Sequence, residues 1–118
     1  MNNDPISAKE RRKARAMVRD ISRQVEFHGQ KLDADEWWTL IFACIYGQEV
    51  IANPFSQQNP NAPTFVIRNK KRTKDLTVTT GAELITQLYA FGAERGVEWS
   101  DPEWISMREQ DEKDARRK

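Results

Sequence analysis

Residues 20–50 read DISRQVEFHGQKLDADEWWTLIFACIYGQEV, a stretch that combines a tight turn with the most apolar helical segment of the chain. Gly29 is the residue type that closes helices in a left-handed conformation, because it has no Cβ to clash. Asp33 and Glu36 have the spacing of a capping box, which predicts the start of a second helix. Residues 37–46 are then apolar on every side, so the whole surface of this helix must be covered. One short chain offers few elements to cover it, and we therefore expect a partner subunit.

The composition indicates one domain with a small core. The chain has 118 residues, which fits a single domain over residues 1–118. Charged residues make up 31% of it, apolar residues only 38%, and the formal net charge is +1. The totals are neither strongly basic nor strongly acidic, so the distribution of charge is more informative than its sum. We expect the polar ends, residues 1–5 and 109–118, to be flexible.

The sequence has no feature of a membrane or secreted protein. No apolar run approaches the length of a membrane span, and residues 1–13 lack the apolar centre of a signal peptide. Cys44 is the only cysteine, which excludes an intrachain disulfide and a cysteine-based zinc site. The expected setting is therefore the cytoplasm.

A first helix is predicted over residues 7–28. Ser7 and Glu10 have capping-box spacing at its start. At helical spacing its residues separate into two sides. The apolar side holds Ala14, Met17, Val18, Ile21, Val25 and His28, and the other side holds Arg12, Arg15, Arg19 and Arg23.

The second half of the chain predicts one hairpin and two more helices. Residues 53–63 are rich in Pro and Asn and should form a loop, whereas residues 64–68 and 76–79 favour strands. We expect these strands to pair, with residues 69–75 as a basic tip that carries Lys70, Lys71, Arg72 and Lys74. A third helix should start at Thr80 with Glu83 in its capping box, and a fourth at Ser100, anchored by Trp104 and Ile105. The predicted fold is mostly helical α+β, with about four helices and one hairpin.

The sequence offers little support for an enzyme. The only histidine, His28, is expected on the apolar side of the first helix, and Cys44 lies in an apolar run where an inert core thiol is common. Asp33, Asp35 and Glu36 are explained by helix capping. There is no glycine-rich phosphate loop and no carboxylate spacing typical of a metal site. We therefore predict no catalytic residues, no metal and no cofactor.

Two basic clusters favour binding to nucleic acid. The arginine side of the first helix and the predicted hairpin tip could both follow a phosphate backbone, although ordinary solvated surface explains them equally well. Tryptophan can stack on unpaired bases. For Trp37, Trp38 and Trp99, however, packing in a core or interface is the favoured interpretation.

Two sequence blocks resemble the NinB (Orf) recombination proteins of lambdoid phages. The first, residues 20–29, reads DISRQVEFHG and continues through Leu32, Asp33 and Ala34 to Trp37; the second, residues 90–101, reads AFGAERGVEWSD. Their order and spacing match, and the likeness covers most of residues 7–104. Arg12 and Lys13 fall where family members carry an Arg-Lys pair. The basic hairpin tip corresponds to a family hairpin in which the individual lysines differ.

The resemblance implies a DNA-binding protein without enzymatic activity that acts in the cytoplasm of a bacterial host. Family members are homodimers that prefer single-stranded DNA without sequence specificity. They are thought to be recombination mediators, which help a recombinase to load onto strands coated by single-strand-binding protein. Members usually have a longer, strand-containing segment before the first helix, so we expect either a compact variant or a truncated start. The loop at residues 53–63 is also longer than the family leads us to expect.

We therefore predict an intertwined homodimer that binds single-stranded DNA. The residues expected to hold phosphates are Arg12, Lys13, Arg15, Arg19, Lys70, Lys71, Arg72 and Lys74. The residues expected at the dimer interface are Trp37, Trp38, Ile41, Phe42 and Ile45. One alternative is a protein-interaction module that binds single-strand-binding protein or a recombinase with its basic face. A metal-dependent nuclease is the second alternative.

Overall fold

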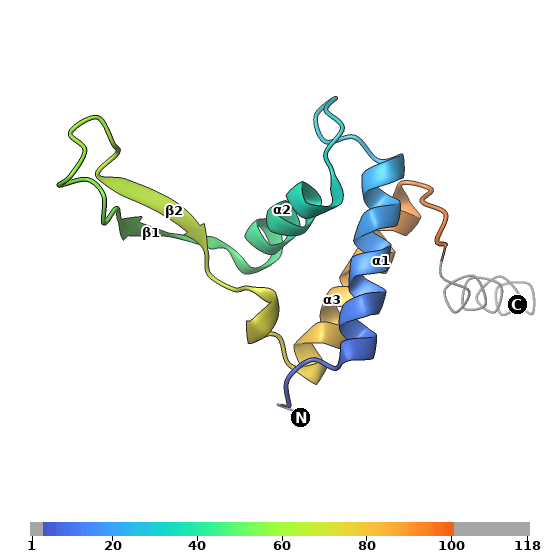
Figure 1. The fold of residues 1–118 in the computed structure, drawn as a ribbon. Helices are drawn as coiled ribbons and strands as arrows, with labels where there is room; N and C mark the ends of the chain where they lie inside the picture. Colours follow the sequence, from blue (N-terminus) through green and yellow to red (C-terminus); the bar gives the residue numbers. More distant parts are fainter. Residues whose placement is uncertain (1–3, 101–118) are drawn as a thin grey trace, which may run out of the picture.

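The computed structural model describes residues 4–100. It has the order α1 (Ala8–Gln24), α2 (Ala34–Tyr46), β1 (Gln48–Ala52), β2 (Phe65–Asn69), a 3-10 turn η1 (Thr73–Asp75) and α3 (Val78–Glu94). The three helices form one body, and the two-stranded hairpin projects away from it (Figure 1). The fold is α+β and mostly helical, as predicted. The expected fourth helix, with Trp104 and Ile105, lies outside the described residues.

Helix α1 begins as predicted and ends four residues early. The Ser7 side chain accepts a hydrogen bond from the Glu10 backbone and caps the first turn. The helix stops at Gln24, and residues 27–30 then form a tight turn in which Phe27 and Gln30 exchange two backbone hydrogen bonds. His28 and Gly29 both have positive φ in this turn. His28 is therefore exposed in a loop, and the prediction that it lies on the apolar side of the helix was wrong.

Helix α2 starts with the predicted capping box. The Asp33 side chain accepts from the Glu36 backbone at 2.8 Å, and the Glu36 side chain accepts from the Asp33 backbone at 3.2 Å. The helix closes at Gly47, whose φ is +84°. Trp37, Ile41 and Phe42 are buried against α1 and α3 within the single chain.

The hairpin forms, but its strands pair differently from the prediction. Strand β2 agrees with the predicted strand to within one residue at each end, whereas its partner is β1, which lies before the proline-rich loop. Residues 53–64 are thus the outer end of the hairpin. The basic residues 70–74 follow β2 and lie beside the helices, so the expected basic tip was wrong.

The predicted second strand is instead the start of α3. Thr77 caps this helix by accepting from the Thr80 backbone at 3.1 Å, and the Thr80 hydroxyl oxygen accepts from the Thr77 backbone at 2.8 Å. The predicted capping box at Thr80 and Glu83 therefore lies three residues too late. Leu76 is fully buried, and its carbonyl accepts from Ile6, while Asp4 accepts from Val78. These bonds tie residues 4–6 to the start of α3, although residues 4 and 5 belong to the end that we expected to be flexible.

Hydrogen bonds join α1 to the segment that follows α3. The Gln24 amide donates to the Glu98 carbonyl and accepts from the Glu98 N–H, both at 2.8 Å. Asp20, only 4% exposed, accepts from the backbone and the hydroxyl of Ser100, each at 2.9 Å. These contacts connect the two sequence blocks that carry the family resemblance.

Trp99 lies between these two pairs and packs against α3. It is 4% exposed and stacks on Tyr89, with ring centroids 6.2 Å apart. Its six-membered ring lies directly over Gly92, where a Cβ would overlap it. Gly92 is therefore required for close approach.

We expect Gly92→Ala to lower the free energy of unfolding by about 1–3 kcal/mol, because the added methyl group overpacks against a buried ring. The better helix propensity of alanine offsets only about 1 kcal/mol of this. Denaturant unfolding measures the change, and Ala93→Ser, at the exposed neighbouring position, is the control. Wild-type stability in Gly92→Ala would contradict this packing.

Asp20→Ala should lower the free energy of unfolding by about 1–3 kcal/mol, since it removes the acceptor for two Ser100 donors. Ser100→Ala removes only the hydroxyl and should cost less. Thermal or urea unfolding of both variants gives the comparison. A larger loss for Ser100→Ala than for Asp20→Ala would show that Asp20 is not the anchor.

Candidate nucleic-acid interface

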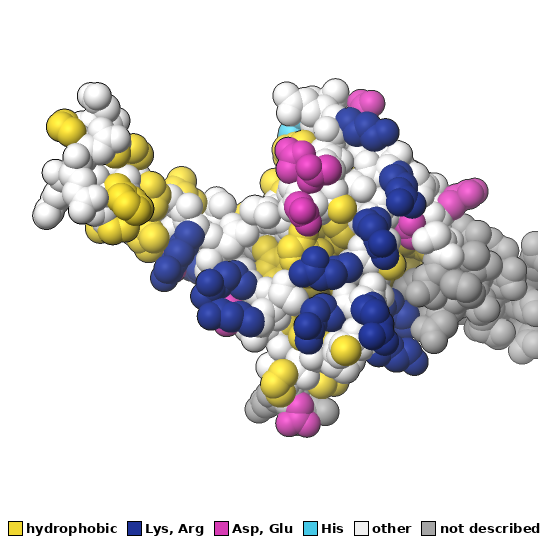
Figure 2. All heavy atoms as spheres, in the orientation of Figure 1, with side chains coloured by type: hydrophobic (Ala, Val, Ile, Leu, Met, Phe, Trp, Pro, Cys, Tyr) yellow, Lys and Arg dark blue, Asp and Glu magenta, His cyan; other side chains and the backbone are white. Residues whose placement is uncertain are grey.

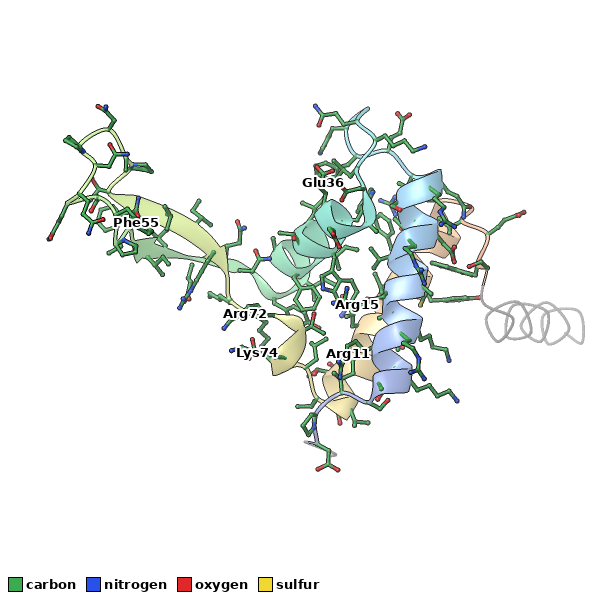
Figure 3. The ribbon with its side chains drawn as sticks, viewed as in Figure 1. Arg11, Arg15, Glu36, Phe55, Arg72 and Lys74 are labelled. Atoms are coloured by element: carbon green, nitrogen blue, oxygen red, sulfur yellow. The ribbon has the colours of Figure 1, made fainter. Side chains whose placement is uncertain are left out.

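Lys and Arg side chains from two distant parts of the chain gather on one face. They lie along α1 and over the segment after β2, with hydrophobic surface between them (Figure 2). The labelled Arg11 and Arg15 lie on the side of α1 that faces the segment carrying Arg72 and Lys74 (Figure 3). The helix and this segment are held in place because both pack against α2 and the start of α3.

Two adjoining hollows connect these groups. One has a volume of about 330 Å³, between α1 and the start of α2, and the other about 250 Å³, between α1, α2 and the 3-10 turn. Arg15 and Trp38 line both of them. We call the combined surface the basic cleft; its main residues are Arg12, Arg15, Arg19, Trp38, Lys71 and Arg72.

The cleft contains five of the eight residues expected to hold phosphates: Arg12, Arg15, Arg19, Lys71 and Arg72. Lys13 is half-buried, and side chains two residues apart on a helix point to nearly opposite sides, so it does not share the face of Arg15. Lys70 and Lys74 are exposed beside the cleft on the same segment. Arg11 lies one turn before Arg15 and extends the row of arginines. The sequence could have indicated this, because residues i and i+4 lie on the same face of a helix.

Trp38, which was expected at a dimer interface, lies in the basic cleft. It is half-buried, with its Nε1 donating to the Thr73 hydroxyl at 3.0 Å and its ring 5.1 Å from that of Phe42. The Arg15 guanidinium carbon lies 5.0 Å from the ring centroid. Because α2 is apolar on all sides, the sequence pattern could not show which aromatic ring faces the arginines.

Tyr46 adds an aromatic contact beside the cleft. The Lys71 ammonium nitrogen lies 5.4 Å from the centre of its ring, a cation–π distance. Burial, and secondarily the negative charge of Glu83, raise the pKa of Tyr46 above its usual value. The phenol of Tyr46 therefore stays neutral at physiological pH.

Three of the other four residues expected at the dimer interface line a separate apolar groove. This groove of about 640 Å³ lies between residues 25–28, α2 and α3. Trp37, Ile41 and Ile45 line it, whereas Trp38 and Phe42 line the basic cleft. Cys44 also lines the groove and is exposed, contrary to the inert core thiol that the sequence predicted.

Within residues 4–100, no group of three or more His, Cys, Asp or Glu side chains could hold a metal ion. The His28 ring lies edge-on to Phe27, with centroids 4.3 Å apart.

None of the helices within residues 4–100 is long and apolar enough to cross a membrane.

A family model described as NinB protein matches residues 4–100, which include the first block of the resemblance, all of the second block except Asp101, and the whole described fold. The chain belongs to the NinB family. The resemblance inferred from the sequence is thereby confirmed.

Curated NinB proteins are similar along most of the chain. A P21 prophage-derived protein NinB of Escherichia coli O6:H1 and the protein ninB of Escherichia phage lambda are each 39% identical over 101 residues, and that of Salmonella phage P22 is 38% identical. The matches cover 86% of this chain but only 64–65% of each relative. The chain thus spans just under two thirds of the length of these NinB proteins.

A solved structure supports the same assignment. A protein titled "Structural Genomics, NinB" superposes with a TM-score of 0.71 at 34% sequence identity. The similarity covers 95% of this chain and 74% of that protein. The arrangement of helices and hairpin is therefore a NinB fold.

Proposed function

We propose that this NinB-family protein binds single-stranded DNA without sequence specificity through the basic cleft. The observation that carries the proposal is that Arg15 from α1 and Lys71 and Arg72 from the segment after β2 line one hollow. These residues are exposed, so their charges are available to phosphates. Lys and Arg contacts to phosphates release counterions and carry no base sequence information, which gives non-specific, salt-dependent binding.

The proposed biological role is that of a recombination mediator. Membership of the NinB family supports it, because the resemblance implies help in loading a recombinase onto strands coated by single-strand-binding protein. The role requires protein partners besides DNA, and these two proteins are the candidates. A module that binds an acidic protein tail in the same cleft is the competing function, and binding measurements with DNA alone separate the two.

Replacing Lys71 and Arg72 together by Ala should weaken single-strand binding and flatten its dependence on salt. Two lost phosphate contacts should reduce the slope of log K against log salt by about 1.4. Fluorescence anisotropy of a labelled oligonucleotide at several salt concentrations measures the slope. The control is Lys31→Ala with Arg95→Ala, which removes the same charge outside the cleft. An equal slope change in both double variants would show that the cleft is not where the phosphates bind.

We also propose that the protein is a homodimer. Val50 and Ile67 pair across the hairpin, and Phe65 lies on the same face. Each of these three residues is more than 60% exposed. A two-stranded hairpin with an exposed apolar face is only marginally stable in water by itself. The same chain also carries the apolar groove lined by Trp37 and Ile45, so a second copy offers complementary surface.

Val50→Ser with Ile67→Ser should convert the dimer to a monomer, because both changes make the exposed face of the hairpin polar. Light scattering after size-exclusion chromatography measures the mass. Glu49→Gln with Arg68→Gln, which removes the 2.6 Å ion pair on the opposite face, should leave the dimer intact. A monomeric wild-type protein, or a dimer in both variants, would argue against the hairpin as the contact.

A further inference from the structure

Trp38 is the aromatic side chain best placed to contact a strand bound in the basic cleft. It lines the hollow that holds Arg12 and Arg19 and also the hollow that holds Lys71. Trp37 and Trp99 are 3% and 4% exposed, so neither presents a ring face to a ligand. Among residues 4–100, the other tryptophans are therefore part of the core, whereas Trp38 lies between two groups of phosphate-binding candidates.

The Trp38 ring is held in position before any ligand binds. Its Nε1 donates to Thr73, and its ring rests against Phe42. Thr73 belongs to the same segment as Lys71, so one hydrogen bond fixes both the ring and the basic segment relative to α2. A side chain that is already ordered loses little conformational freedom when a partner stacks on it.

Arg15 occupies the position over the ring in the unbound protein. Its guanidinium carbon lies over the Trp38 ring, 5.0 Å from the centroid, and Arg15 is exposed. A guanidinium and a nucleobase are both planar groups that stack on an indole. Arg15 can therefore leave the ring to a base and pair with the adjoining phosphate, so that the protein exchanges one stacking partner for another.

We propose that Trp38 stacks on an unpaired base of a strand bound in the basic cleft, and that this contact makes the cleft prefer single strands to duplex DNA. The inference rests on the proposed DNA binding and adds the residue that distinguishes the two forms of DNA. In a duplex both faces of each base are covered by its neighbours, so stacking on Trp38 requires a base that is free to leave the stack.

The competing explanation is that Trp38 only supports the cleft by packing. A supporting role depends on apolar volume, whereas stacking depends on a flat aromatic face. Trp38→Phe keeps a flat face and Trp38→Leu keeps apolar bulk without one. Both variants lose the hydrogen bond to Thr73, so comparing them isolates the aromatic face.

The first experiment measures the affinity of both variants for a labelled single strand and for the matching duplex by fluorescence anisotropy. Trp38→Leu should bind the single strand about 5- to 100-fold more weakly, the range typical of one lost base–aromatic stack. Its affinity for duplex should fall by a much smaller factor, the same as for Trp38→Phe, because both variants lose the hydrogen bond to Thr73. Trp38→Phe should recover much of the loss for the single strand. Phe55→Ala, at an exposed aromatic residue on the hairpin loop, is the control and should bind like wild type.

The second experiment uses only the wild-type protein, so it does not depend on the folding of a variant. A single strand of abasic nucleotides has the same phosphate charge as the normal oligonucleotide but no bases. Its affinity should be lower by a similar factor, while its salt slope should be unchanged because the phosphate contacts remain.

The outcomes separate this inference from the function on which it rests. Equal affinity of wild type for normal and abasic strands, or equal losses of Trp38→Leu for single strand and duplex, would overturn the stacking role while leaving DNA binding intact. Absence of binding to any DNA by wild type at low salt would overturn the proposed function itself. A selective loss with Trp38→Leu, together with weaker abasic binding, would support both.

Discussion

The hydrogen bonds between α1 and residues 98–100 fix the position of the helix that carries Arg12, Arg15 and Arg19. Gln24 pairs with both backbone groups of Glu98, and buried Asp20 accepts two bonds from Ser100. Each of these bonds joins residues more than seventy positions apart. Trp99, between Glu98 and Ser100 in the chain, packs over Gly92 and so holds this segment against α3. The arginine row therefore keeps a defined orientation toward the rest of the cleft.

The cleft combines charge with a partly apolar floor. Arg15 and Lys71 each lie over an aromatic ring, Trp38 and Tyr46 respectively. In the unbound protein each of these cations thus interacts only weakly with its ring. Moving it to a phosphate costs less free energy than breaking a buried ion pair would. Such an arrangement keeps the side chains near the surface that a strand would follow and available to phosphates. The formal net charge of +1 hides this local concentration.

The hairpin and the helical body have different requirements for stability. The helices bury an apolar core that includes fully buried Met17, Ile21 and Leu84. The hairpin leaves Val50 and Ile67 largely exposed and contacts the body mainly near its base, where Asn69 donates to the Thr39 carbonyl. The proposed dimer would cover this apolar surface, and it would place two basic clefts in one assembly.

The sequence by itself determined the caps at Ser7 and Asp33, the fold class and the NinB family, because these depend on residues a few positions apart or on two specific sequence blocks. Only the tertiary structure decided which segment pairs with residues 65–69 and where α3 begins. The Thr77 cap and the burial of Leu76 overrode the strand preference of residues 76–79. Likewise, α2 is apolar all round, so only packing could direct Trp37 into the core and Trp38 toward Arg15.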